Sequence, residues 1–353
     1  MPASLPLLVV VFVAAAAGVW IAGIWLSRTT DVLSHRLHLG EALAGSILLA
    51  FTTNLPEVAI TASAALAHHL GIAIGNILGG IAIQTVVLAV LDVWGLGRAD
   101  PLTYMAASLQ LVLEGALVIA VLVVAVMGTQ LSRSLYFGRL EPAAVLIVVI
   151  WAAGLWLLGR SARGLPWQEQ GNAPGGQDVP RGTRVKMTNE RANRRGVGTA
   201  KAALVFTAAA VVTLVGGVVL ERSGERIAGH IGMTGVLFGA TVLAAATALP
   251  EVSTGLASIR MRDYQLAVSD IFGGNAFLPV LFLVAAVLSG SAVLPAAHKT
   301  DIYLTALGAL LTVVYIFGLI FRPRRQLVAV GIDSALVVAL YALGIVGLVF
   351  VNG

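Results

Sequence analysis

Apolar residues form long, nearly unbroken runs along most of this 353-residue chain, and short polar stretches separate them. A bilayer-spanning helix needs about 20 mostly apolar residues, and ten runs meet that length. The first, which contains Pro6 to Trp25, is too long and too continuous for a signal peptide. The pattern predicts an all-α integral membrane protein with ten transmembrane helices. The predicted spans are residues 5–27, 40–67, 71–94, 103–127, 141–159, 202–220, 234–258, 265–289, 301–321 and 327–351.

One polar segment, residues 160–201, interrupts this pattern and divides the ten spans into five and five. Its Gly, Pro, Gln and charged residues end in a basic run from Arg181 to Lys201, a composition typical of disordered linkers. We therefore predict a first five-helix repeat over residues 1–159, a disordered basic linker over 160–201, and a second five-helix repeat over 202–353.

The two halves share sequence at a fixed offset of 194 residues. Leu55-Pro56-Glu57-Val58 recurs as Leu249-Pro250-Glu251-Val252, and Gly79-Gly80 recurs as Gly273-Gly274 without a gap. Because each half has an odd number of spans, the second half enters the membrane from the opposite side. The repeats are therefore predicted to be inverted, an arrangement in which substrates bind near the membrane midplane on interrupted helices.

The distribution of Lys and Arg along the chain predicts its orientation in the membrane. Of the 22 Lys and Arg residues, 17 fall on one side of the predicted spans, and cytoplasmic loops carry such an excess. The N-terminus is then outside and the linker cytoplasmic, in a cell membrane that the Ala-, Gly-, Val- and Arg-rich composition suggests is bacterial. The net charge of +5 is attributed to these loops, so no nucleic-acid partner is expected. The chain has no cysteine, which excludes disulfides and thiolate metal sites.

Glu57 and Glu251 are the candidate functional residues. A carboxylate in the hydrocarbon core costs about 2.5–3.5 kcal/mol on insertion scales, so intramembrane acids usually serve a function. Pro56 and Pro250 free the carbonyls four residues earlier, and free carbonyls at a helix break coordinate cations. Oxygen ligands suit hard cations. The alternative is a purely structural role, in which each glutamate is protonated and hydrogen-bonded inside the bundle. Further candidate ligands are Thr53, Thr247, Asn54, and the aligned Ala50 and Ala244.

Three other polar residues lie in the predicted spans. Asp270 is predicted to be either a helix-entry cap or a pathway carboxylate, and Asn76, which aligns with it in the first half, is a further candidate for the pathway or a proton relay. Glu114 is either a proton relay or a structural partner of a neighbouring helix. The span-end acids and the pair His68-His69 are interpreted as solvated. Those acids are Asp92, Asp301 and Asp333.

The motif residues resemble the cation/calcium antiporter superfamily, whose best-known members are the sodium/calcium exchangers. A kinked Thr-x-Leu-Pro-Glu helix is followed in each half by a glycine-containing helix, Gly75-Asn76-Ile77-Leu78-Gly79 in the first. The resemblance covers both halves, and only the linker and the peripheral spans carry no motif. It implies ten helices, of which the second, third, seventh and eighth line the site.

This chain departs from the family pattern in ways that remove oxygen ligands. Gly80 and Gly274 stand where the family usually has serine. The family also has Asn or Asp 27 residues beyond each glutamate, where this chain has Gln84, a longer oxygen ligand, and Leu278, which coordinates nothing. Calcium takes 6–8 oxygen ligands, so Na⁺ or H⁺ stays open as the cargo.

The predicted function is a secondary-active cation antiporter that exchanges Ca²⁺ or another cation against Na⁺ or H⁺ by alternating access. Inorganic cations and the lipid bilayer are its expected partners, and no resident cofactor is expected. One alternative is a monovalent cation/H⁺ antiporter without Ca²⁺ activity, and another is a non-transporting membrane scaffold. An intramembrane enzyme is disfavoured, because the chain has neither a His-Glu-x-x-His zinc motif nor a cysteine nucleophile.

Overall fold

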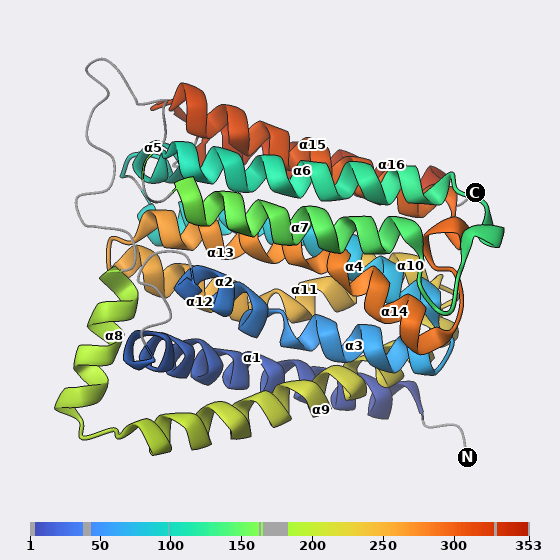
Figure 1. Cartoon of the computed structure of the whole chain (residues 1–353), viewed down its shortest axis with the longest axis horizontal. Coiled ribbons are helices and arrows are strands. Elements are labelled where there is room, and N and C mark those ends of the chain that lie inside the picture. The colour runs from blue at the N-terminus through green and yellow to red at the C-terminus, as the bar shows by residue number, and fades with distance from the viewer. Residues whose placement is uncertain are drawn as a thin grey trace.

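The computed structural model describes residues 4–37, 44–97, 99–161, 164, 183–327 and 330–351, and it is almost wholly helical (Figure 1). The first half contains α1 (Leu5–Arg36), α2 (Ala44–Thr53), α3 (Leu55–Leu66), α4 (Leu70–Leu91) with the π-turn η1 (Asp92–Leu96), α5 (Leu102–Ala106), α6 (Leu109–Thr129), η2 (Arg133–Leu135) and α7 (Pro142–Ser161).

The second half follows the short helix α8 (Thr183–Arg194). It contains α9 (Thr199–Ile231), α10 (Gly235–Phe238), the π-turn η3 (Gly239–Leu243), α11 (Ala244–Thr247), α12 (Leu249–Arg260), α13 (Tyr264–Phe277), η4 (Leu278–Val280), α14 (Leu281–Ser289), η5 (Leu294–Ala296) and α15 (Lys299–Phe321). A two-residue antiparallel ladder, β1 (Gln326–Leu327) with β2 (Val330–Gly331), precedes α16 (Ile332–Val351).

Nine helices or helix runs in the described ranges are long and apolar enough to cross a membrane. The tenth candidate is α2 with α3, which is broken at Asn54 and begins at the edge of a described range. Large apolar side chains such as Trp156, Phe321 and Phe350 point outward and are more than half exposed, as lipid-facing residues are. The prediction of an all-α multi-pass membrane protein is confirmed, and the count of ten spans stays a prediction.

Equivalent helices of the two halves run in opposite directions. Nη1 of Arg36 on α1 donates a 3.3 Å hydrogen bond to Oγ1 of Thr199 at the start of α9, and the pairs in contact further along are Val19 with Gly216 and Phe12 with Gly224. Residue numbers in these contacts decrease along α1 while they increase along α9, so the two helices are antiparallel (Figure 1). Since α1 and α9 are the first helices of their repeats, this contact confirms the inverted relationship.

Both motif helices break immediately before their Leu-Pro-Glu segment. Helix α2 ends at Thr53 and α3 begins at Leu55, while α11 ends at Thr247 and α12 begins at Leu249. Each proline is the second residue of its helix, where its missing N–H is tolerated. The predicted interruption of the two helices is therefore confirmed.

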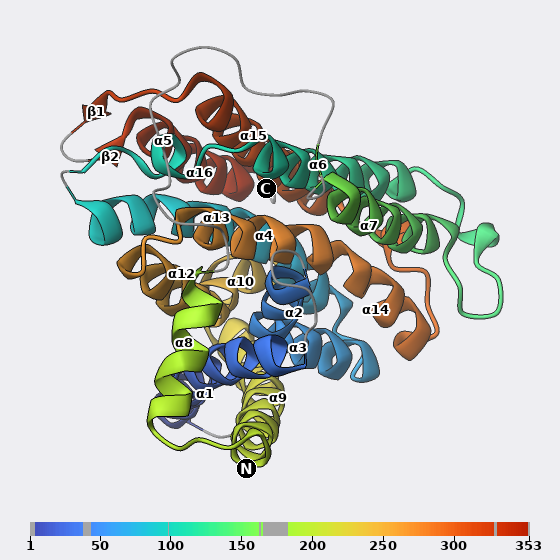
Figure 2. The ribbon, with the colours of Figure 1, turned by 60° about the vertical axis from the view of Figure 1, so that its left-hand side comes forward.

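The core lies between the two broken helices and the helices that follow them. Gly79 on α4 approaches η3 so closely that a Cβ there would lie 2.1 Å from the Cα of Ala240. Glycine is what permits this backbone contact. Figure 2 shows α1, α8 and α9 grouped on one side of the bundle, and α15 and α16 on the other.

The prediction of a disordered linker is wrong for residues 183–201, while residues 165–182 lie outside the described ranges. Residues 183–194 form α8, and α9 begins at Thr199. Two polar side chains of α8, Arg184 and Asn189, are buried against the bundle. Asn189 accepts a 3.0 Å hydrogen bond from Nε of Arg36 on α1. Tertiary contacts thus order a segment whose composition alone favours disorder.

Candidate cation-binding site

The structure brings the two motif glutamates together. Glu57 lies in the first turn of α3 and Glu251 in the first turn of α12, and both side chains are fully buried. They are close enough for their charges to repel each other, and Asp270 on α13 also repels Glu251. Three acidic side chains from both repeats therefore share one region of the interior.

The predicted threonine ligands cross between the repeats. Thr247 of the second half lies beside the Glu57 carboxylate of the first. Thr53 of the first half lies beside Glu251 and Asp270 of the second. Each glutamate is thus flanked by a threonine hydroxyl of the other repeat. Thr53 is the last residue of α2 and Thr247 the last residue of α11, so both hydroxyls lie at the helix breaks.

Asn54 and Gln84 add amide groups on the first repeat's side only. Nε2 of Gln84 donates to Oδ1 of Asn54 at 3.0 Å and to Oε1 of Glu57 at 3.5 Å. Their counterparts in the second half are Ala248 and Leu278, which are both buried in the apolar core. The site is therefore asymmetric, with amide groups beside Glu57 and a second acid, Asp270, beside Glu251.

The backbone oxygens of Ala50 and Ala244 are already engaged. The Ala50 carbonyl accepts from Nδ2 of Asn54 at 2.6 Å and from Oγ1 of Thr53 at 3.2 Å. The Ala244 carbonyl accepts from Oγ1 of Thr247 at 3.2 Å. In this structure, these two carbonyls orient the side chains of Thr53, Asn54 and Thr247, and a cation would have to compete with those donors for them.

Asp270 is not a helix cap, and that part of the prediction is wrong. Asp263 caps α13 by accepting from the backbone N–H of Leu266, whereas Asp270 is buried well inside the helix. Oγ1 of Thr254 donates to Oδ2 of Asp270 at 2.6 Å. Its pathway role remains a prediction.

The two other pathway candidates are also buried. Asn76 lies inside α4, and Glu114 lies inside α6. Neither amide atom of Asn76 has a hydrogen-bond partner within the described ranges. A role for either residue in ion or proton movement remains a prediction.

Several buried oxygens in the centre have no well-formed hydrogen bond within the described ranges. They are Oε2 of Glu57, both carboxylate oxygens of Glu251, Oδ1 of Asp270 and Oε1 of Gln84. Buried polar atoms are almost always paired, and an uncompensated buried charge is strongly destabilising. The cluster therefore needs a positive partner, either a metal cation or protons.

The donor set limits what such a partner is. No group of three or more His, Asp or Glu side chains with metal-binding geometry occurs in the described part of the chain. A cation held here would take two carboxylates together with neutral hydroxyl and amide oxygens. That set is oxygen-only, as hard cations require.

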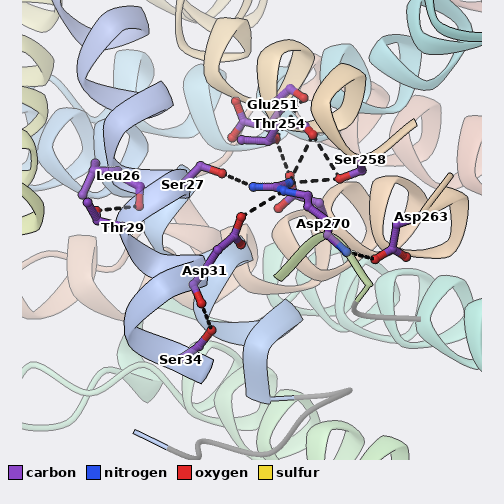
Figure 3. Close-up of polar contacts among 11 residues, drawn as sticks. Leu26, Ser27, Thr29, Asp31, Ser34, Glu251, Thr254, Ser258, Asp263 and Asp270 are labelled. Atoms are coloured by element: carbon purple, nitrogen blue, oxygen red, sulfur yellow. Dashed lines mark hydrogen bonds and ion pairs between the residues drawn. The ribbon is translucent and has the colours of Figure 1, made fainter. Parts of the chain in front are cut away.

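Sequence reasoning missed an ion pair beside this cluster. Arg184 of α8 and Asp31 of α1 are each 2% exposed, and their Nε and Oδ2 atoms lie 3.1 Å apart (Figure 3). Asp31 falls beyond the predicted first span, and Arg184 lies in the segment predicted to be disordered. Neither position carried an apolar or motif signal.

The acids interpreted as solvated are buried, so that interpretation is wrong. Asp92 accepts from the backbone N–H groups of Leu102 at 2.8 Å and Gly331 at 2.7 Å, which joins loops from the two halves. Asp301 completes a capping box at the start of α15, and Asp333 accepts from the N–H of Ser334. Each carboxylate secures a helix or loop terminus.

The histidine interpretation fails for His69, whose ring contacts two acids of α9. Its Nδ1 lies 3.0 Å from Oε1 of Glu221, which is buried, and its Nε2 lies 3.5 Å from Oε1 of Glu225. These contacts join the start of α4 to α9 at the end of the bundle remote from α8 (Figure 1).

Comparison with known proteins agrees with this architecture. The chain shares 26% identity over 274 residues with inner membrane protein YrbG of Escherichia coli, covering 77% of each chain. Its fold matches the crystal structure of the H⁺/Ca²⁺ exchanger CAX with a TM-score of 0.65 at 12% identity, over 97% of this chain and 87% of that one. A structure of the sodium-calcium exchanger NCX_Mj, soaked with Na⁺ and Sr²⁺, matches with a TM-score of 0.61 at 16% identity, over 97% and 99%.

Two inverted helical repeats with broken, acid-bearing helices define a multi-pass membrane protein with the fold of cation exchangers. The family model for the sodium/calcium exchanger protein matches residues 7–159 and 201–350, which together make up most of the chain. The chain therefore belongs to the sodium/calcium exchanger family, a family of transporters. This confirms the resemblance drawn from the motifs.

Proposed function

We propose that this protein is a secondary-active cation antiporter. Glu57 and Glu251 bind the transported cation and its counter-ion alternately, at the same site. The observation that carries the proposal is the burial of these two carboxylates side by side, one from each inverted repeat, with oxygens that lack hydrogen-bond partners. The flanking Thr53 and Thr247 hydroxyls, with Asn54 and Gln84, complete the proposed ligand set.

Exchange follows from the cost of leaving the site empty. Two ionised carboxylates in a dry interior repel each other and lose their hydration. The carrier therefore changes conformation readily only when that charge is neutralised. One divalent ion, two monovalent ions or two protons each satisfy the requirement. Competition between them for one pair of carboxylates couples the flux of one ion to the counterflux of another.

The proposed cargo is Ca²⁺ or another cation, exchanged against Na⁺ or H⁺. The relatives CAX and NCX_Mj are named as an H⁺/Ca²⁺ and a sodium-calcium exchanger, respectively. A second candidate, a monovalent cation/H⁺ antiporter, is favoured by Leu278, which places an apolar side chain where Gln84 places an amide group beside Glu57 in the other half. The proposed setting is a bacterial cell membrane, with the N-terminus outside and α8 in the cytoplasm.

The test is ion exchange by the purified protein in proteoliposomes, with Ca²⁺, Na⁺ and K⁺ offered in turn against a Na⁺ or pH gradient. Glu57→Gln and Glu251→Gln should each abolish exchange, because each removes one of the two charges. Asp100→Asn, at an exposed acid that contacts Arg324, is the matched control and should keep parental flux. Near-normal flux in either glutamate variant removes the assignment.

The same preparation separates the two cargo classes and the scaffold alternative. Flux with Na⁺ or K⁺ but not Ca²⁺ identifies the monovalent antiporter. A ligand that binds only the folded state stabilises that state by about 2.7 kcal/mol when its free concentration is 100 times its Kd. A protein without flux, and with no shift in its unfolding temperature for any of these cations, is the non-transporting scaffold.

A further inference from the structure

Arg184 is the most deeply buried basic residue in the described part of the chain, and each of its three guanidinium nitrogens donates a hydrogen bond. Figure 3 labels the acceptors Ser27, Asp31, Thr254 and Ser258. Nε donates to Oδ2 of Asp31 at 3.1 Å. Nη1 donates to the carbonyl of Thr254 at 3.1 Å and to Oγ of Ser258 at 3.0 Å. Nη2 donates to Oγ of Ser27. All three nitrogens of one side chain are thus held by protein oxygens.

These contacts join helices that belong to different repeats. Asp31 and Ser27 lie on α1, while Thr254 and Ser258 lie on α12. The backbone N–H of Arg184 also donates to Oδ2 of Asp263 at the start of α13, at 3.0 Å. The first turn of α8 therefore contacts helices of both halves, and Figure 2 shows α8 reaching from α12 to α1 along the outside of the bundle.

A single residue, Thr254, separates the guanidinium from the central carboxylates. Its carbonyl accepts from Arg184, and its hydroxyl donates to Oδ2 of Asp270 at 2.6 Å. Asp270 in turn interacts electrostatically with both Arg184 and Glu251. A positive charge therefore stands directly beside the acid cluster on the side that α8 occupies.

A cavity of about 300 Å³ adjoins this contact, and its lining includes none of Glu57, Glu251 and Asp270. The vestibule, as we name this cavity, is lined by residues of α1, α8 and α12 that include Asp31, Arg184, Thr188, Ser253, Thr254 and Arg260. Its lining includes Arg184 itself and Thr254, the residue that reaches Asp270. The vestibule thus ends where the guanidinium stands.

We infer that Arg184 is a gate residue that closes the path between the vestibule and the acid cluster. Its guanidinium fills the space between α1 and α12, and its charge repels an incoming cation while it satisfies Asp31. A cation that arrives from this side reaches Asp270 and Glu251 only when the guanidinium leaves Thr254 and Ser258. Because Arg184 holds both repeats at once, its release also frees α1 to move relative to α12.

This inference rests on the proposed function, because a gate has a role only in a transporter. Its test measures the accessibility of the acid cluster to a reagent and does not measure transport. The chain has no cysteine, so one introduced cysteine is the only thiol in the protein. Thr53→Cys places that thiol beside Glu251 and Asp270, on the inner side of Arg184. Its rate of reaction with a membrane-impermeant, positively charged thiosulfonate is measured in vesicles with the α8 face exposed and in vesicles of the reverse orientation.

The gate is opened by the charge-neutral pair Asp31→Asn with Arg184→Gln. Removing Arg184 alone leaves Asp31 buried and unpaired, which endangers folding. The paired change avoids that charge while it removes the cation and shortens the side chain. Arg184→Lys restores the charge as a conservative rescue. Lys186→Gln is the matched control on the same helix, because Lys186 is exposed.

The Thr53→Cys reporter should react at least about tenfold faster from the α8 face in the neutral pair than in the parent. Arg184→Lys and Lys186→Gln should stay near the parental rate. A second reporter, Ala257→Cys, lines the vestibule outside the gate and should react equally in all four backgrounds. Equal reactivity of the Thr53→Cys reporter with and without Arg184 overturns the inference, as does faster reaction only from the opposite face.

A structural role alone would not reproduce this pattern. General loosening of the fold would raise the reactivity of both reporters and broaden the elution profile of the protein. Parent protein without ion flux would overturn the proposed antiport, and the labelling comparison would still decide whether Arg184 controls access to Thr53.

Discussion

Gly23 of α1 is in contact with Pro250, the proline in the first turn of α12. A Cβ at Gly23 would lie 2.6 Å from the Cβ of Pro250. The same relationship recurs 194 residues along the chain, where a Cβ at Gly217 of α9 would lie 2.9 Å from the carbonyl oxygen of Pro56. The first helix of each repeat therefore packs, through a glycine, on the broken helix of the other repeat.

Gly23→Ala should slow exchange and destabilise the protein. The new methyl group must displace Pro250, which sets the position of Glu251, and overpacking of this kind costs about 1–3 kcal/mol. We expect a lower unfolding temperature in detergent and a lower maximal flux in proteoliposomes. Gly18→Ala is the control on the same helix, because nothing lies within 4 Å of a Cβ there. Equal behaviour of the two variants would show that the close contact is not required.

Gly217→Ala should have the same effect on the other glutamate. Its methyl group would meet Cβ of Ala59 at 2.7 Å as well as the Pro56 carbonyl, so α3 must shift. Gly229→Ala, also on α9 and in open space, is the control. Thermal unfolding and flux are measured in parallel with the Gly23 variants. If only one of the two glycine variants were impaired, the repeats would not share this packing device.

The architecture was predictable from local chemistry. Proline removes a backbone donor wherever it occurs, so Pro56 and Pro250 identify the broken helices without tertiary information. The inversion follows from an odd number of apolar runs in each half. The recurrence of Gly23 as Gly217 also lay in the sequence at the 194-residue offset, but an isolated glycine pair has no pattern to distinguish it from other glycines.

The surroundings of the site were not predictable. Asp31 and Arg184 are separated by 153 residues and meet only because α8 folds back onto α1 and α12. Hydrophobic periodicity reports which face of a helix is buried, and it carries no information on a polar helix held by specific hydrogen bonds. Asp270 illustrates the same limit, because its position in α13 depends on Asp263 taking the cap seven residues earlier.

Gln84→Leu should weaken cation binding. The amide nitrogen of Gln84 donates to Asn54 and Glu57, and its buried Oε1 has no hydrogen-bond partner among the described residues, which leaves it available to a cation. Leucine has a similar size and reproduces the residue found at position 278 in the other half. We expect about tenfold weaker affinity in titration calorimetry, which corresponds to about 1.4 kcal/mol.

The control for the Gln84 variant is Gln130→Leu, at an exposed position at the end of α6. Unchanged affinity in Gln84→Leu would remove Gln84 from the ligand set. It would leave Glu57 with the neighbouring threonine and asparagine as the first repeat's contribution to binding.

Glu141 offers a pH-dependent test of the packing between the halves. It precedes α7, outside the spans, and its carboxylate accepts from the backbone N–H groups of Val293 at 3.0 Å and Leu294 at 3.1 Å. Burial raises the pKa of Glu141 above its ordinary value of 4.5, and these two hydrogen bonds oppose the rise only in part. The folded protein therefore holds this proton more tightly than the unfolded chain does.

An acid with a raised folded-state pKa stabilises the fold when protonated and loses that contribution as the pH climbs from 4.5 through the raised pKa. Glu141→Gln keeps an oxygen that accepts one N–H and cannot ionise. The stability of this variant relative to the parent should therefore increase with pH over that window, as measured by thermal unfolding in detergent at a series of pH values. Glu190→Gln, at an exposed position of α8, is the control. A stability difference that stays constant with pH, or falls as pH rises, would show that the two backbone donors compensate the buried charge.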